Sequence, residues 1–275
     1  MGLPFIKMHG CGNDYVFVEG FTHDVPADPG MLARQVSCRH TGIGSDGLVM
    51  MQPPADSDAD VWMRMFNADG TEGSMCGNAL RCVAMWCFLT GRCEFECRIQ
   101  IGGRVVSCRI AAVEQHGHSA TVSVCLGEAI VSADVTPLNG LALFDMPVAV
   151  RKVSVGNPHA VVFVPDVDQI PLAEIGPQLE CHPEFPDRTN VEFVQVLASD
   201  RLRVRVWERG SGITLACGSG ACASLAAAIT EGLVNAEQPT AIQMPGGELL
   251  VQRDPQGQYW LTGPAVETFH GVWYS

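Results

Sequence analysis

Two cysteines, Cys76 and Cys217, stand in near-duplicate surroundings. Each follows a polar, glycine-rich turn and precedes a glycine and a run of small residues that can form a helix. A thiol at a helix N-terminus lies beside unpaired backbone N–H groups and the positive end of the helix dipole, which lower its pKa. Two such thiols could carry two protons to and from one substrate. For either cysteine alone, the alternative is a buried structural thiol.

Further landmarks recur at nearly the same spacing, which indicates an internal duplication. The two cysteines lie 141 positions apart (217 − 76), close to half of the 275 residues. The other recurring landmarks, both at a spacing of 144, are Asn13 with Asn157 and Asp46 with Asn190. For any single pair the alternative is chance recurrence of Gly/Asn turns, which are common. The ordered set predicts two similar halves that share one site.

Composition excludes several classes of partner. The formal net charge is −13 with only 17 Lys and Arg, so neither nucleic acid nor an anionic membrane is an expected partner. The sequence has no apolar run of signal-peptide or membrane-spanning length, so we expect a cytoplasmic protein. The twelve cysteines are then reduced thiols, most of them small core residues.

Short strand-like runs dominate the chain and predict an α+β fold. Apolar and polar residues alternate in several of them, as in half-buried antiparallel strands. The runs are 15–18, 47–51, 61–66, 104–110, 120–126, 160–164, 191–196 and 201–207. Helices are expected at 29–38, after each of the two cysteines, and at 172–180. This pattern predicts two similar domains, each a mostly antiparallel β-sheet or barrel wrapped round a central helix.

The polar stretch 114–119 marks the expected domain boundary. The strand-like tail could return to the first domain. We therefore expect an N-terminal half of residues 1–118 plus 264–275, a C-terminal half of residues 119–263, and an active site in the cleft between them.

At this point the motifs resemble those of diaminopimelate epimerase, a family of cofactor-independent amino-acid epimerases in lysine and peptidoglycan precursor synthesis. The segments that carry the resemblance are 7–15, 39–47, 67–82, 156–159, 190–193 and 208–222. The resemblance implies an isomerase that interconverts L,L- and meso-2,6-diaminopimelate by thiolate and thiol proton transfer. It implies no cofactor, no metal, a diamino dicarboxylate substrate and a homodimer.

The resemblance also assigns roles to single residues. Cys76 and Cys217 correspond to the catalytic acid and base, and His159 and Glu208 to polar residues that tune the thiol pKa values. The residues implied to bind substrate are Asn13, Asn67, Gly77, Asn78, Asn157, Asn190, Glu208, Arg209, Gly218 and Ser219. Phe269 matches a position where some members place a tyrosine in the dimer contact. Asn13 and Asn157 each follow a glycine and could instead close turns.

Two positions depart from the family pattern. Ala79 stands where the family usually has glycine. Alanine would be strained if that position needs a positive φ, and favourable if it is helical. Gly47 stands where some members have a substrate-binding glutamine, so that role is not carried over.

The chemistry suits two thiols. Inversion at an α-carbon requires removal of a weakly acidic proton and delivery of another to the opposite face, which two groups do directly. Helix N-termini behind Gly77 and Gly218 could hold the carboxylate and stabilise the carbanion, although such residues also serve ordinary helix capping. Arg209 could clamp a distal carboxylate or form a surface salt bridge.

Two other functions stay open from the residues. One is a different amino-acid racemase on the same scaffold, acting on proline or histidine. The other is a zinc or redox protein, which the spacing of the cysteines disfavours because no paired Cys-x-x-Cys occurs.

Overall fold

The computed structural model describes residues 2–73, 75–114, 116–144 and 146–274. It divides into two units, one comprising the chain up to Cys125 together with the segment from Thr262 onward, the other Leu126–Leu261. None of the helices in these described segments is long and apolar enough to cross a bilayer.

The first unit carries two helices. Its elements are β1 (Leu3–Gly10), β2 (Asn13–Glu19), α1 (Pro29–Ser37), β3 (Gly47–Gln52), β4 (Val61–Asn67), β5 (Glu72–Gly73), α2 (Gly77–Leu89), β6 (Glu96–Ile101), β7 (Arg104–Val113), most of β8 (Ser119–Glu128) and most of β18 (Gln258–Trp273).

The second unit repeats the same order. Its elements are β9 (Ile130–Val131), β10 (Thr136–Leu143), β11 (Met146–Ser154), β12 (Pro158–Phe163), a 3₁₀ turn (Val167–Gln169), α3 (Leu172–Glu180), β13 (Asn190–Ala198), β14 (Arg201–Glu208), β15 (Gly212–Thr214), α4 (Gly218–Thr230), β16 (Thr240–Met244) and β17 (Gly247–Arg253).

Strand pairing shows the duplication directly. In the first unit β2 pairs in parallel with β3, β3 pairs antiparallel with β4, and β4 with β5, before α2 begins. In the second unit β12, β13, β14 and β15 pair in the same way before α4. The strand register corrects one of the equivalences expected from the sequence. Tyr15 lies opposite Gly47, and its counterpart His159 lies opposite Asn190. Asn190 therefore corresponds to Gly47 and not to Asp46.

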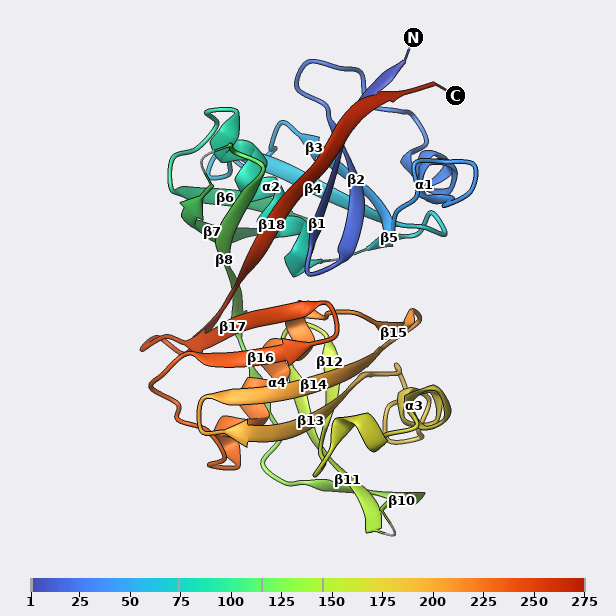
Figure 1. Cartoon of the computed structure of the whole chain (residues 1–275), viewed down its shortest axis with the longest axis vertical. Helices are drawn as coiled ribbons and strands as arrows, with labels where there is room; N and C mark the ends of the chain where they lie inside the picture. Colours follow the sequence, from blue (N-terminus) through green and yellow to red (C-terminus); the bar gives the residue numbers. More distant parts are fainter. Residues whose placement is uncertain (1, 74, 115, 145, 275) are drawn as a thin grey trace. The chain divides into compact units, whose positions relative to one another are not determined.

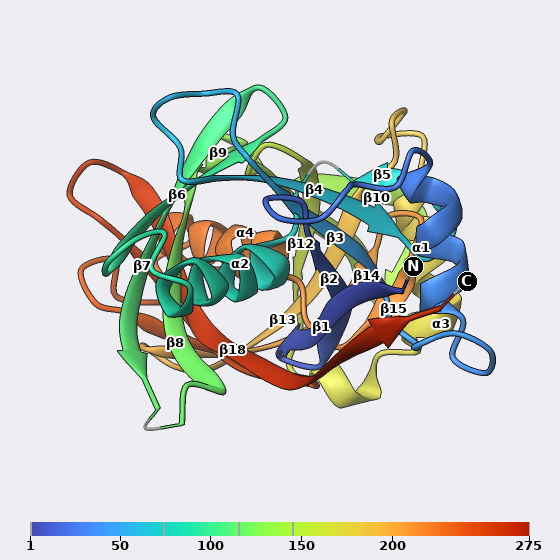
Figure 2. The same cartoon turned by 90° about the horizontal axis from the view of Figure 1, so that it is seen from above.

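Each unit buries one helix. Eleven successive residues of α2, from Gly77 to Cys87, are buried, and so is nearly all of α4 up to Ala228. A helix that is apolar on all sides must be covered on all sides, so the strands curve round it. Figure 2 shows β6, β7, β8 and β18 curving past α2. Most strand pairs are antiparallel, which confirms the predicted α+β class.

The units divide seven residues later than the sequence suggested. Residues 120–124 of β8 pair with β7, so this part of the strand belongs to the first unit and the division falls after Cys125 instead of after residue 118. The tail returns as β18, in which Trp273 lies opposite Leu3 of β1 (Figure 1). Thr262 joins the first unit with it, and its hydroxyl hydrogen-bonds that of Ser123.

Candidate active site

Both candidate thiols occupy the N-cap position of their unit's buried helix. Cys76 caps α2 and its sulfur accepts a hydrogen bond from the Ala79 backbone N–H at 3.5 Å. Cys217 caps α4 and its sulfur accepts one from the Gly220 N–H at 3.4 Å. An N-cap group normally satisfies such orphan donors with an oxygen. Here a sulfur takes that place, so each thiol lies against the positive end of a helix dipole.

Amide groups surround Cys76. Asn13 Oδ1 accepts from the Cys76 thiol at 3.4 Å and from Asn78 Nδ2 at 3.1 Å. The Asn13 amide in turn donates to Asp46 at 2.8 Å. Tyr15 is buried beside this group, and burial, followed by the neighbouring Cys76, raises the pKa of its hydroxyl well above the usual value. The Tyr15 side chain is therefore a neutral hydroxyl at physiological pH.

Arg81 is a charged group near this thiol that sequence reasoning missed. It lies one turn along α2, is fully buried, and donates to Asn78 Oδ1 at 2.6 Å and to the Pro264 carbonyl at 3.0 Å. Its electrostatic interactions extend to Cys76. An arginine on a predicted helix is usually a surface residue, so only burial distinguishes this one.

A chain of polar groups leads to Cys217 in the second unit. The Ser219 hydroxyl is 3.6 Å from the Cys217 sulfur and accepts from Asn157 Nδ2 at 3.3 Å. Asn157 Oδ1 is 3.1 Å from His159 Nε2, and His159 Nδ1 is 2.7 Å from a carboxylate oxygen of Glu192. Glu192 is the second charged residue that sequence reasoning missed, because a glutamate inside an alternating strand predicts a solvent-facing side chain.

Burial and two carboxylates raise the proton affinity of Cys217, against the lowering expected from its position at a helix start. The pKa of this thiol is raised well above its usual value, first by burial and then by the negative charges of Glu208 and Glu192. Burial also raises the pKa of Glu208, against the opposing effect of a hydrogen bond from the Thr214 hydroxyl. Cys217 therefore holds its proton in the ligand-free protein.

The remaining predicted ligands lie at strand ends and helix starts. Asn190 Oδ1 accepts a hydrogen bond from the backbone N–H of Arg209 at 2.9 Å, so these two predicted ligands contact each other directly. The exposed guanidinium of Arg209 donates to the Asp187 carbonyl at 3.2 Å. Asn67 is exposed at the end of β4 and donates to Thr71 at 3.0 Å. Gly77 and Gly218 are the first residues of α2 and α4.

The two departures from the family pattern have local explanations. Ala79 is helical and fully buried, and it is not among the residues with positive φ, so alanine favours the helix without strain. A side-chain carbon on Gly47 would approach the Phe66 carbonyl oxygen to 2.1 Å. Glycine is therefore the residue that this strand pairing accommodates.

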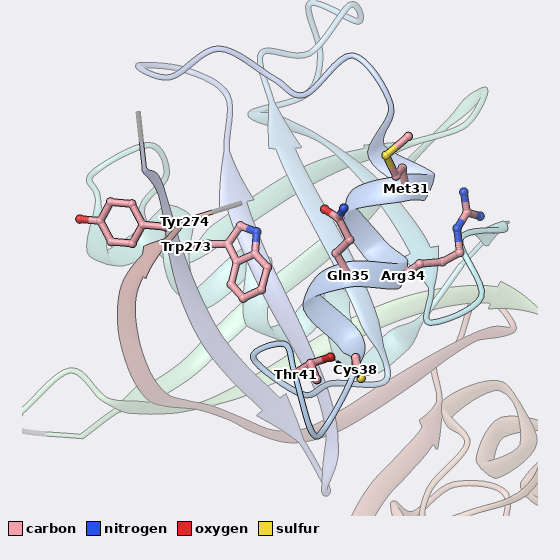
Figure 3. Close-up of a pocket in the computed structure, with 7 residues that line it drawn as sticks. All are labelled: Met31, Arg34, Gln35, Cys38, Thr41, Trp273 and Tyr274. Atoms are coloured by element: carbon pink, nitrogen blue, oxygen red, sulfur yellow. Dashed lines mark hydrogen bonds between the residues drawn. The ribbon is translucent and has the colours of Figure 1, made fainter.

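A separate cavity of about 440 Å³ lies beside α1, and none of the predicted site residues lines it (Figure 3). Its lining residues are Met31, Arg34, Gln35, Cys38, Thr41, Trp273 and Tyr274. Phe269 lies further back on β18, where its ring packs edge-on against Phe5 at a centroid distance of 5.9 Å.

Solved structures with the same fold belong to several enzymes. A phenazine biosynthesis protein of the PhzF family from Bacillus anthracis aligns with a TM-score of 0.74 and 14% identity over 100% of both chains. A hydroxyproline epimerase from Agrobacterium vitis aligns with a TM-score of 0.69 and 16% identity, covering 98% of this chain and 90% of that one. At such identities the likeness shows the fold alone.

Sequence comparison is more specific. The family model described as diaminopimelate epimerase matches residues 5–131 and 151–268. A diaminopimelate epimerase from Acetivibrio thermocellus is 42% identical over 98% of both chains. Another from Desulforudis audaxviator is 42% identical over 98% of this chain and 99% of its own. The chain therefore belongs to the diaminopimelate epimerase family.

Proposed function

We propose that this protein interconverts L,L- and meso-2,6-diaminopimelate in lysine and peptidoglycan precursor biosynthesis. Relatives named diaminopimelate epimerase match this chain over nearly its whole length. The observation that carries the mechanism is the matched pair of thiols, Cys76 and Cys217, each capping a buried helix.

In the proposed reaction one cysteine, as thiolate, takes the α-proton, and the other, as thiol, delivers a proton to the opposite face of the same carbon. The first ends as a thiol and the second as a thiolate, so protons and charge balance. Cys217 begins protonated, because burial and two carboxylates raise its pKa. We assign Cys217 as the acceptor and Cys76, whose thiol donates to Asn13 Oδ1, as the donor in the L,L-to-meso direction, so Cys217 must lose its proton when substrate binds, and the roles reverse in the back reaction.

The carbanion that forms needs stabilisation by the protein itself. Backbone N–H groups at the starts of α2 and α4 would receive the α-carboxylate, and Gly77 and Gly218 leave room for close approach. The positive ends of these fixed dipoles stabilise the negative charge that develops in the transition state. The proposed mechanism therefore uses no cofactor.

The distal end of the substrate would be held by polar side chains. We assign Asn67, Asn190 and Arg209 to it, with Asn13, Asn78, Asn157, Ser219 and Glu208 closer to the reacting carbon. The Arg209 guanidinium suits a bidentate contact with the distal carboxylate because it is planar. Arg209→Lys should raise the KM for diaminopimelate, and an unchanged KM would place Arg209 outside the site.

The test is conversion of L,L-diaminopimelate to the meso form by purified protein without added cofactor. In deuterated water, early product should carry deuterium at the inverted carbon while unreacted substrate keeps its proton. Proline, hydroxyproline and histidine form the comparison panel. Turnover of one of these instead of diaminopimelate would replace the proposed substrate.

The proposed enzyme is a homodimer. Exposed apolar side chains gather near the end of β18, where Phe269 is 45%, Val272 48% and Tyr274 77% exposed. A second copy of the chain would cover them. Phe269→Glu should shift the mass measured by sedimentation equilibrium from dimer to monomer, and an unaltered mass would exclude this face.

The proposed compartment is the cytoplasm. The structure places each of the twelve cysteines outside any disulfide, which fits a reducing environment. A fractionation experiment that finds the protein in an oxidising compartment would contradict this assignment.

A further inference from the structure

Glu192 is a fully buried carboxylate behind Cys217. One of its oxygens pairs with His159 Nδ1 at 2.7 Å, and both side chains are 0% exposed. Its other oxygen has no hydrogen-bond partner among the described residues. A buried carboxylate with an unsatisfied oxygen is unfavourable for folding, which indicates that it serves something other than stability.

The surroundings of His159 fix the orientation of its ring. One ring nitrogen faces the Glu192 carboxylate and the other faces Asn157 Oδ1 at 3.1 Å, so both have oxygen acceptors. Asn157 is then oriented with its NH₂ group toward the Ser219 hydroxyl, which lies beside the Cys217 sulfur.

The chain makes room for this carboxylate in one unit only. A side-chain carbon on Gly220 would lie 2.6 Å from Glu192 Oε1, whereas the corresponding residue of α2 is Ala79. By strand register Glu192, opposite Val161, corresponds to Val49, opposite Phe17. The duplicated framework therefore carries a glutamate with a matching glycine at one thiol, and a valine with an alanine at the other.

We propose that Glu192 is a positioning residue of the epimerase reaction, holding the His159 ring in place and, with its buried negative charge, keeping Cys217 a thiol until substrate binds. The proposal rests on the proposed function for its kinetic consequences. The carboxylates whose charges act on Cys217 include Glu208 from β14 and Glu192 from β13, and His159 from β12 acts on Glu208. Removing Glu192 leaves the charge of Glu208 acting on Cys217.

The first experiment measures thiol ionisation and needs no turnover. Wild type and Glu192→Gln are alkylated with iodoacetamide across a range of pH, and modification of Cys217 is mapped by peptide fragmentation. The midpoint for Cys217 should move to lower pH by about one unit, because a nearby anion that opposes the thiolate is lost. An unchanged or higher midpoint in folded protein would overturn the role of the charge.

Glu180→Gln is the matched control. Glu180 is another buried carboxylate of the same unit, accepting from Trp207 Nε1 at 2.6 Å and from the Gly210 N–H at 3.0 Å. Its replacement should leave the Cys217 midpoint unaltered. A shift equal to that of Glu192→Gln would show a general effect of weakened packing and would count against the proposal.

The second experiment separates charge from position. Glu192→Asp keeps the negative charge but withdraws the carboxylate from His159, and it covers the case in which Glu192→Gln does not fold. We expect a Cys217 midpoint near that of wild type with kcat lowered about tenfold and KM nearly unchanged, the pattern of a lost transition-state interaction. Wild-type kcat in both variants would overturn the positioning role. If wild type itself does not epimerise diaminopimelate, the proposed function fails while the alkylation result still decides the charge role.

Discussion

Cys76 and Cys217 cap their helices with nearly the same backbone geometry, φ −145° and ψ 113° against φ −127° and ψ 113°. The charges around them differ. The first thiol is partly exposed and has the buried cation Arg81 on its own helix, whereas the second is 6% exposed and faces Glu208 and Glu192.

The counterparts of these charged residues are neutral. At the 141-residue offset of the two helices, Arg81 corresponds to Cys222, and Glu208 corresponds to Asn67. A duplicated framework has thus kept the helix-start geometry while the charges diverged. This difference favours one starting form in the ligand-free protein, in which Cys217 is protonated.

The largest expected effect is loss of either thiol. Cys76→Ala and Cys217→Ala should stay folded and lose epimerisation by several orders of magnitude, because each removes one of the two proton carriers. The measurement is the initial rate of meso product formation, with circular dichroism as the control for folding. If one variant retained near-normal turnover, the two halves would not share the chemistry.

Arg81→Met should raise the pKa of Cys76, whereas Glu192→Gln should lower the pKa of Cys217. Loss of the buried cation should raise the pH at which Cys76 is alkylated and lower the unfolding temperature, because Asn78 Oδ1 and the Pro264 carbonyl lose their donor. Arg81→Lys, which keeps the charge, is the control and should retain most of the wild-type alkylation profile. Equal alkylation profiles for wild type and the two variants would show that Arg81 does not affect the ionisation of Cys76.

Exchanging the third residue of α4 and of α2 tests why the starts of these two helices differ. Gly220→Ala should lower kcat because the new methyl group displaces Glu192, which lies 2.6 Å from its position. Ala79→Gly should leave the chemistry nearly intact and destabilise the protein by about 0.5–1 kcal/mol in chemical denaturation. A faster or equally active Gly220→Ala enzyme would mean that Glu192 tolerates displacement.

The smallest effect concerns a thiol outside the site. A hydrogen bond from the Thr41 hydroxyl at 3.0 Å, with backbone N–H groups, lowers the pKa of exposed Cys38 to about 7. Cys38 should therefore be alkylated at neutral pH while Cys217 is not, and Thr41→Val should slow that reaction without changing epimerisation. Rapid labelling of Cys217 at neutral pH in wild type would contradict the assigned proton positions.

Sequence alone predicted the four helices closely. The expected 29–38 and 172–180 correspond to α1, Pro29–Ser37, and α3, Leu172–Glu180, and α2 and α4 begin directly after their cysteines. Small-residue runs and capping positions are local signals, so they can be read from the chain. The sequence did not predict the β10–β11 hairpin, because Pro137 and Gly140 interrupt the strand pattern of β10.

The sequence by itself determined the duplication, the strand-rich halves with their central helices and the position of both thiols at helix starts, because repeated motifs and capping patterns are local. It did not reveal the burial of Arg81 and Glu192, since a charged residue on a helix or in an alternating strand predicts a solvent-facing side chain. Burial depends on strands paired from distant parts of the chain, such as β18 returning beside β1. Only the tertiary structure decided which charge each thiol faces, because that depends on which side chains the folded sheets enclose with each helix.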